Sequence, residues 1–88
     1  MALNFPNLSR SFDASKLRVR FWGHDASFEV SFFIAVEALW LVDPDATADE
    51  EGMLSAFDLN RDRIFAAAER AYRRDRRDSY TLSVSDMN

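Results

Sequence analysis

Residues 17–33 alternate between apolar and other side chains on both sides of the stretch "GHDA", and this alternation constrains the fold more than any other feature of the chain. A period of two is the spacing at which a β-strand returns to the same face of a sheet. Because "GHDA" contains residues that favour turns, the two runs predict a β-hairpin. The register that buries both apolar sets places Phe21 opposite Phe28, Val19 opposite Val30, Leu17 opposite Phe32 and Arg20 opposite Glu29.

Three further segments are expected to pack with this hairpin. Residues 79–85 alternate again, with Tyr80, Leu82 and Val84 on one face, and predict a strand of the same sheet, while residues 11–13 are a candidate short strand. The segment "AVEALWLV", residues 35–42, predicts a short helix that ends before Pro44, or alternatively a continuation of the preceding strand.

Residues 48–74 predict one long amphipathic helix. Thr47 and Glu50 in "TADE" stand at capping-box spacing, and an apolar stripe follows them. At 1.5 Å per residue this helix would measure about 40 Å, against a domain diameter of roughly 30 Å. It must therefore overhang the domain, bend, or meet a second subunit. Asn60 falls within the stripe, so its amide is expected to bond a loop backbone or a partner.

Together these elements predict a single α+β domain over residues 1–88. A small antiparallel sheet, made of the N-terminal hairpin or meander and the C-terminal strand, packs against the long helix and the short one. The long helix is expected on the sheet face that contains Phe21 and Phe28.

Composition narrows the function classes. The chain has 88 residues, 48% of them hydrophobic, which suits one globular domain with a modest core. It has no cysteine and a single histidine, which excludes disulfides and thiolate zinc sites, and no cofactor is expected. We expect a cytoplasmic protein, because neither a signal peptide nor an apolar run long enough to span a membrane is present. The net charge of −4 argues against a chain built chiefly to hold nucleic acid.

Several longer stretches resemble a known family. "MALNFPN", "VRFWGHDASFEVSFF", "AFDLNRDRIFAAAERAY" and "SYTLSVSD" are similar to a family of small bacterial proteins catalogued as domain of unknown function 1488. The similarity covers nearly the whole chain. It implies a single short α+β domain and carries over no activity and no functional residues.

Two motifs invite a catalytic or metal-binding reading. His24 and Asp25 are adjacent near the predicted turn, but a general base also needs a pocket and a reacting group within reach. "DPDATADEEG" places acidic residues at alternate positions, as a calcium loop does, yet Ala48 and Leu54 stand where such a loop needs glycine and glutamate. We therefore expect no catalytic residue and no metal site, and the acidic residues suit a helix N-terminus instead.

The chain's C-terminal half contains a basic cluster, "ERAYRRDRRDSY". Its arginines are each able to neutralise a phosphate, so they are a candidate polyanion-binding site: Arg70, Arg73, Arg74, Arg76 and Arg77. The same residues also suit the negative end of a helix, where Glu69 pairs with Arg73 and nearby aspartates dilute the positive charge.

The second face of the predicted sheet is the other candidate surface. It carries arginine and aromatic residues where a one-sided sheet would have small polar ones: Arg18, Arg20, Trp22 and Phe33, with Trp40 of the short helix as a possible cover. Arginine between aromatic rings suits a protein interface or stacked bases. The hypothesis favoured is a non-catalytic interaction module with a protein partner, which includes self-association. Binding of nucleic acid through the Arg70–Arg77 cluster is the alternative, and no membrane partner is expected.

Overall fold

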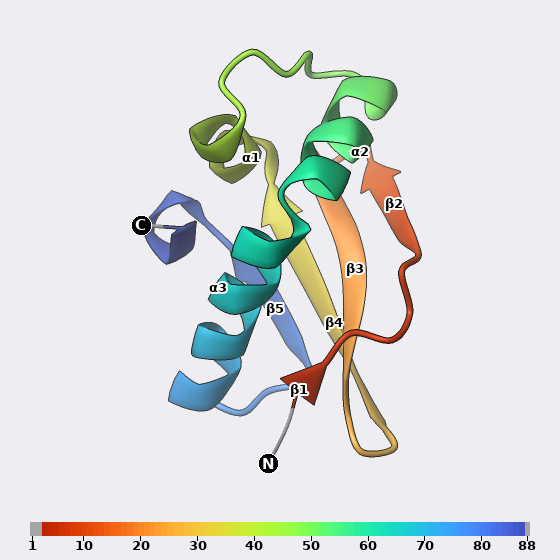
Figure 1. Ribbon diagram of the computed structural model, residues 1–88, viewed down its shortest axis with the longest axis vertical. Helices are drawn as coiled ribbons and strands as arrows, with labels where there is room; N and C mark the ends of the chain where they lie inside the picture. Colours follow the sequence, from red (N-terminus) through yellow and green to blue (C-terminus); the bar gives the residue numbers. More distant parts are fainter. Residues whose placement is uncertain (1–2, 88) are drawn as a thin grey trace.

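The chain forms two layers, in which a mixed sheet of five strands carries the two longest helices across one face (Figure 1). The computed structural model describes residues 3–87. In chain order the strands are β1 (Leu3–Asn4), β2 (Arg10–Asp13), β3 (Arg18–Asp25), β4 (Phe28–Ala35) and β5 (Ser79–Leu82). The helices are α1 (Val36–Val42), α2 (Glu50–Leu59) and α3 (Arg61–Arg74), and the short 3₁₀ helix η1 (Val84–Met87) follows β5. The predicted α+β class is confirmed.

β3 and β4 form the predicted hairpin, but the predicted register is wrong by four residues. The observed pairs include Phe21 with Phe32, Val19 with Ile34, Arg20 with Phe33 and His24 with Glu29. The reason is a tighter turn than "GHDA". Only residues 26 and 27 lie between the strands, and Ala26 adopts a φ of 56°, the positive value that two-residue hairpin turns need.

The error of four residues leaves the choice of buried face intact, because an even shift keeps every side chain on its side of the sheet. Val19, Phe21, Val30 and Phe32 are buried as predicted. The exceptions are the two ends of the predicted set. Leu17 lies in the turn before β3 and is 51% exposed, and Phe28 lies beside the hairpin turn and is 74% exposed.

β5 joins the sheet, but parallel to β4 rather than antiparallel as predicted. The strand order is β1-β3-β4-β5, and β2 also pairs with β3. The chain between β4 and β5 forms α1, α2 and α3 and returns to the end of the sheet at which β4 begins. A parallel pair requires such a crossover connection. β5 ends at Leu82, so Val84 belongs to η1 and is 40% exposed instead of continuing the strand.

The predicted 40 Å helix is divided at Asn60 into α2 and α3. The molecule is 36 Å along its longest axis, so an unbroken helix of that length would have projected beyond the sheet. Asn60 has a φ of −125°, and its Nδ2 donates to the carbonyl of Ala56 at 2.9 Å, which satisfies the amide within its own helix. The N-cap of α2 is Asp49 rather than the predicted Thr47, because the Asp49 carboxylate accepts the Gly52 N–H at 2.9 Å.

Aromatic rings fill the space between the layers. The Phe21 ring lies 5.3 Å from that of Phe32 and 5.0 Å from that of Phe57 on α2. Phe5, in the segment between β1 and β2, stacks on Phe65 of α3 at 4.1 Å. Burying a side chain of this size stabilises the fold by about 1.5–3 kcal/mol. This core holds β3 and β4 rigidly from one side, and so fixes the residues on their other side.

Candidate functional site

The side of the sheet away from α2 and α3 carries a row of arginine and aromatic side chains, which we call the open face: Arg18, Arg20, Trp22 and Phe33. The register places Arg20 directly beside Phe33 across β3 and β4. All four are half-buried, and the neighbouring polar residues on the same face, such as Ser11 and Thr81, are exposed. Within residues 3–87 no helix lies over this row, because α2 and α3 pack on the opposite face (Figure 1).

The two arginines of the open face stack on its aromatic rings. The Arg18 guanidinium carbon lies 3.6 Å from the centre of the Phe33 ring. The Arg20 guanidinium lies 5.0 Å from the ring of Trp22 and 5.6 Å from that of Phe33. A guanidinium over a ring gains about 0.5–2 kcal/mol, depending on how far it is removed from water. These contacts favour the stacked arrangement of the row within a single copy of the chain.

Arg20 has one hydrogen bond and one buried donor without an acceptor. Its terminal nitrogen NH2 donates to the Ser31 hydroxyl at 3.1 Å, while its Nε is buried with no hydrogen-bond partner. Arg18 differs, because its Nε donates to the Asp13 carboxylate at 3.2 Å and that ion pair neutralises its charge. Hydrogen bonds from Ser15 and Arg18 hold the pKa of Asp13 below its usual value.

Trp40, the fifth residue of the predicted surface, is not part of this row. It lies on α1, is 40% exposed, and its indole Nε1 donates to the carbonyl of Ala46 at 2.9 Å. This bond fixes the indole against the loop before α2. The open face therefore comprises four of the five predicted residues.

His24 and Asp25 are not brought together. They are successive residues of β3, so their side chains leave the strand on opposite faces. His24 lies on the open side beside Glu29, whereas Asp25 accepts a 2.5 Å hydrogen bond from the Tyr72 hydroxyl on the helix side. That bond to Asp25 raises the pKa of Tyr72. Arg76 lies 3.9 Å from the same carboxylate. This Asp25, Tyr72 and Arg76 group was not predicted, since no sequence spacing links β3 to the end of α3.

Neither metal ligands nor a membrane span is found in the described part of the chain. Among residues 3–87, no three histidine or acidic side chains come close enough to hold a metal ion. No helix in that range combines the length and apolar character needed to cross a bilayer.

The arginine cluster at the end of α3 lies on the surface, and each of its members already has an acceptor. Four form ion pairs: Arg73 with Glu69, Arg74 with Asp86, Arg76 with Asp25 and Arg77 with Asp75. The fifth, Arg70, donates to the backbone carbonyl of Asp86 at 3.1 Å. Glu69 and Asp75 lie close to their partners in the sequence, whereas Asp86 and Asp25 reach the cluster only through the fold.

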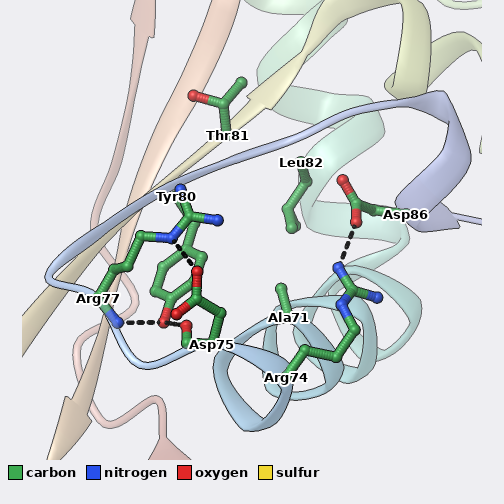
Figure 2. Close-up of a pocket in the computed structure, with 8 residues that line it drawn as sticks. All are labelled: Ala71, Arg74, Asp75, Arg77, Tyr80, Thr81, Leu82 and Asp86. Atoms are coloured by element: carbon green, nitrogen blue, oxygen red, sulfur yellow. Dashed lines mark hydrogen bonds and ion pairs between the residues drawn. The ribbon is translucent and has the colours of Figure 1, made fainter.

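A pocket of about 220 Å³ opens between the end of α3 and β5, and we call it the β5-edge pocket. Arg77 lies at one end of it and Arg74 at the other, with Thr81 on the strand that borders it (Figure 2). Arg77 donates to Asp75 at 2.9 Å, and Arg74 to Asp86 at 3.0 Å. The Tyr80 hydroxyl donates to the Asp75 carbonyl and accepts the Arg77 backbone N–H at 2.6 Å, which holds the turn between α3 and β5.

Asp86 lies outside the sequence of the arginine cluster but accepts from two of its members, Arg70 and Arg74. Partial burial acts to raise the pKa of this carboxyl, but bonds from the Ser83 N–H and from Arg74 outweigh it and leave the pKa below its usual value. Asp86 is therefore a charged carboxylate of the β5-edge pocket at neutral pH.

Comparisons with known proteins identify a family and no individual relative. Neither the curated proteins nor the solved structures gave a match to this chain. The family model described as protein of unknown function, DUF1488, matches residues 3–84, which is nearly all of the chain. The fold that the sequence resemblance implied is the fold observed, and the chain belongs to the DUF1488 family.

Proposed function

We propose that this protein is a non-catalytic interaction module whose open face binds a second copy of the chain. One observation carries the proposal. Arg20 is held half-buried between two aromatic rings, with a buried and unpaired Nε, on a sheet face that no helix of residues 3–87 covers. A buried unpaired donor between aromatic rings is not expected on a surface that contacts only water.

The chemistry of the row suits a protein interface. Arginine and tryptophan are the residues that most often dominate binding energy at the centre of interfaces. Arg20 and Trp22 are already stacked, so little side-chain freedom remains to be lost when a partner docks. The hydrogen bond from Arg20 to Ser31 uses one of its five donors, which leaves others for a partner's acceptor.

The charge pattern of the open face favours a second copy as the partner. Glu29 lies on the same face as Arg20 and is exposed, and it forms no ion pair within residues 3–87. Trp22 and its partner Ser31 lie midway between Arg20 and Glu29 along the strands. A two-fold axis that crosses the strands at Trp22 exchanges the two ends, and places Arg20 of each copy over the cross-strand pair of His24 and Glu29 of the other. Sheets packed face to face lie about 10 Å apart, a gap that the Arg20 and Glu29 side chains together span.

Acidic groups on and near the row favour protein over nucleic acid as the partner. Asp13 pairs with Arg18, and Glu29 lies on the same face, so a phosphate backbone would meet carboxylates at both ends of the row. The overall charge of −4 acts in the same direction.

The test is a charge exchange followed by sedimentation velocity. We expect the wild-type protein to associate at micromolar concentrations, and Arg20→Glu and Glu29→Arg each to sediment as monomers because like charges then meet across the interface. An equimolar mixture of the two variants restores both attractive pairs and is expected to form a heterodimer. Loss of a central contact of about 2 kcal/mol corresponds to roughly 30-fold weaker association.

Arg63→Glu is the matched control, because it makes the same charge change at an exposed position of α3 on the other layer. It is expected to leave association unchanged. A wild-type chain that stays monomeric at high micromolar concentration would refute the proposal, as would a mixture that fails to associate. Binding of a generic oligonucleotide that is lost in Arg20→Glu would assign the face to nucleic acid instead.

A further inference from the structure

We infer that the outer edge of β5 binds an extended, acidic peptide segment, which adds to the sheet as a further strand beside the β5-edge pocket. This site is separate from the open face and does not depend on self-association. The argument rests on the backbone of β5, on the pocket and on the two arginines that flank it.

β5 is an edge strand with free backbone groups. It follows β4 at the end of the strand order, and its other side has no strand partner within residues 3–87. The Ser31 N–H donates to the Asp78 carbonyl, and in a parallel pair alternate residues turn their backbone groups toward the partner. Ser79 and Thr81 are therefore the residues whose N–H and carbonyl groups point outward, and both are exposed. An added strand would find donors and acceptors at the spacing it needs.

The edge lacks two of the common devices that prevent such pairing. Its sequence, Ser-Tyr-Thr-Leu, contains neither a proline nor a lysine. Arg74 and Arg77 flank the pocket. Asp86 and Asp75 neutralise their charges, but the remaining N–H donors of the two guanidinium groups favour a strand that carries carboxylates.

The pocket has room and donors for a carboxylate. Its volume of about 220 Å³ accommodates one side chain of moderate size. Arg74 and Arg77 are 65% and 62% exposed, and each forms an ion pair with one carboxylate, so both retain donors for a second one. In a strand placed beside β5, every second side chain would point toward α3 and these arginines. The favoured ligand is therefore a peptide with acidic residues at alternate positions.

A peptide suits this site better than a nucleic acid does. Asp75 and Asp86 line the pocket and repel phosphates and carboxylates alike, so charge does not decide between the two ligands. The outward backbone groups of Ser79 and Thr81 decide it, because they match another peptide backbone. An oligonucleotide is consequently the competing outcome that the experiment must detect.

The experiment uses the full chain and a synthetic eight-residue peptide in which valine and glutamate alternate. Binding is followed by fluorescence anisotropy and by amide chemical shifts. We expect the Ser79 and Thr81 amides to shift and their hydrogen exchange to slow, because those N–H groups gain acceptors. Arg74→Ala and Arg77→Ala are each expected to weaken binding roughly tenfold, the effect of losing a hydrogen bond to a charged group. Arg63→Ala, on the same helix but outside the pocket, is the control.

Two further probes separate strand addition from simple charge attraction. A peptide that is N-methylated at alternate residues has the same charge but lacks the backbone donors, and it is expected not to bind. Thr81→Pro removes an outward N–H that β4 does not use, and is expected to abolish binding. If this variant does not fold, the hydrogen exchange of the wild-type Thr81 amide decides the question. Absence of peptide binding, equal binding of the N-methylated peptide, or tighter binding of an oligonucleotide would each overturn the inference.

Discussion

Gly23→Ala adds one methyl group to a closely packed point of the core. A Cβ at this position would lie 2.9 Å from Phe5 Cε1 and 3.1 Å from both Leu3 Cδ1 and Phe32 Cε2. Carbon atoms in favourable contact are about 3.5–4.0 Å apart, so three side chains must move. Phe32 yields least easily, because it is fully buried in β4 and its ring is stacked on those of Phe21 and Tyr80.

The expected cost follows from two opposing effects. Overpacking of this kind costs about 1–3 kcal/mol, while the stiffer unfolded chain of the alanine variant offsets about 0.4–1 kcal/mol. The net loss of unfolding free energy is about 1–2 kcal/mol, which for a domain of this size lowers Tm by about 4–16 °C. Thermal unfolding by circular dichroism and urea unfolding by tryptophan fluorescence both measure it.

A double variant separates overpacking from other causes. Phe5→Leu removes the ring atom closest to the new methyl group, so the combined variant is expected to lose less stability than the sum of the two single losses. Additive losses would show that the methyl group does not contact Phe5. A Gly23→Ala protein as stable as the wild type would refute the reasoning about this contact altogether.

Three further predictions concern the turn, the electrostatics and a helix start. Ala26→Gly is expected to raise stability by about 0.5–1 kcal/mol, because the φ of 56° is strained for alanine and free for glycine; a lower Tm would contradict this. Hydrogen bonds, chiefly from Arg10, hold the pKa of Asp58 below its usual value, so this ion pair stabilises the protein above about pH 4, and the stabilisation is lost as pH falls through the folded-state pKa. Asp58→Asn is therefore expected to flatten the acid limb of stability measured by urea unfolding, and parallel curves for the two proteins would count against it. Asp49→Ala removes the acceptor for the Gly52 N–H and is expected to cost about 0.5–2 kcal/mol in the same assay, whereas a cost near zero would mean that water replaces the cap.

Much of the fold was predictable because side-chain periodicity reports which face of an element is buried. Val19, Phe21, Val30 and Phe32 were assigned to the core on that basis alone. The register was not predictable from the same pattern, because a slip of four residues keeps every residue on its face and only the turn decides between the two. Ala26 gave no signal, since alanine is an unusual residue at a positive φ.

Errors of another kind arose where distant segments meet. The direction of β5 depends on where three helices deliver the chain, and the alternation in residues 79–85 is the same for a parallel and an antiparallel strand. The division of the long helix was foreseen only as one of three alternatives. It occurs at Asn60, whose amide bonds Ala56 of its own helix instead of a loop or a partner.

The sequence predicts which residues form the candidate surfaces, but not how their side chains interact. Alternation placed Arg18, Arg20, Trp22 and Phe33 on one face, and the structure confirms that they share it. The stacking of each guanidinium and the unpaired Nε of Arg20 depend on rotamers that a sequence does not reveal. Asp86 was missed as the acceptor for the arginine cluster because it lies beyond the helix that carries the arginines.

The parallel pairing of β5 with β4 has a consequence for how the protein is made. Three helices must emerge from the ribosome after β4 before β5, its second neighbour in the sheet, emerges. During that interval the edge of β4 that β5 later covers has unpaired backbone amides. Other partly folded chains can pair with this edge, and such pairing leads to aggregation. Chaperone dependence during translation should accordingly fall in a circular permutant that places β5 ahead of β4.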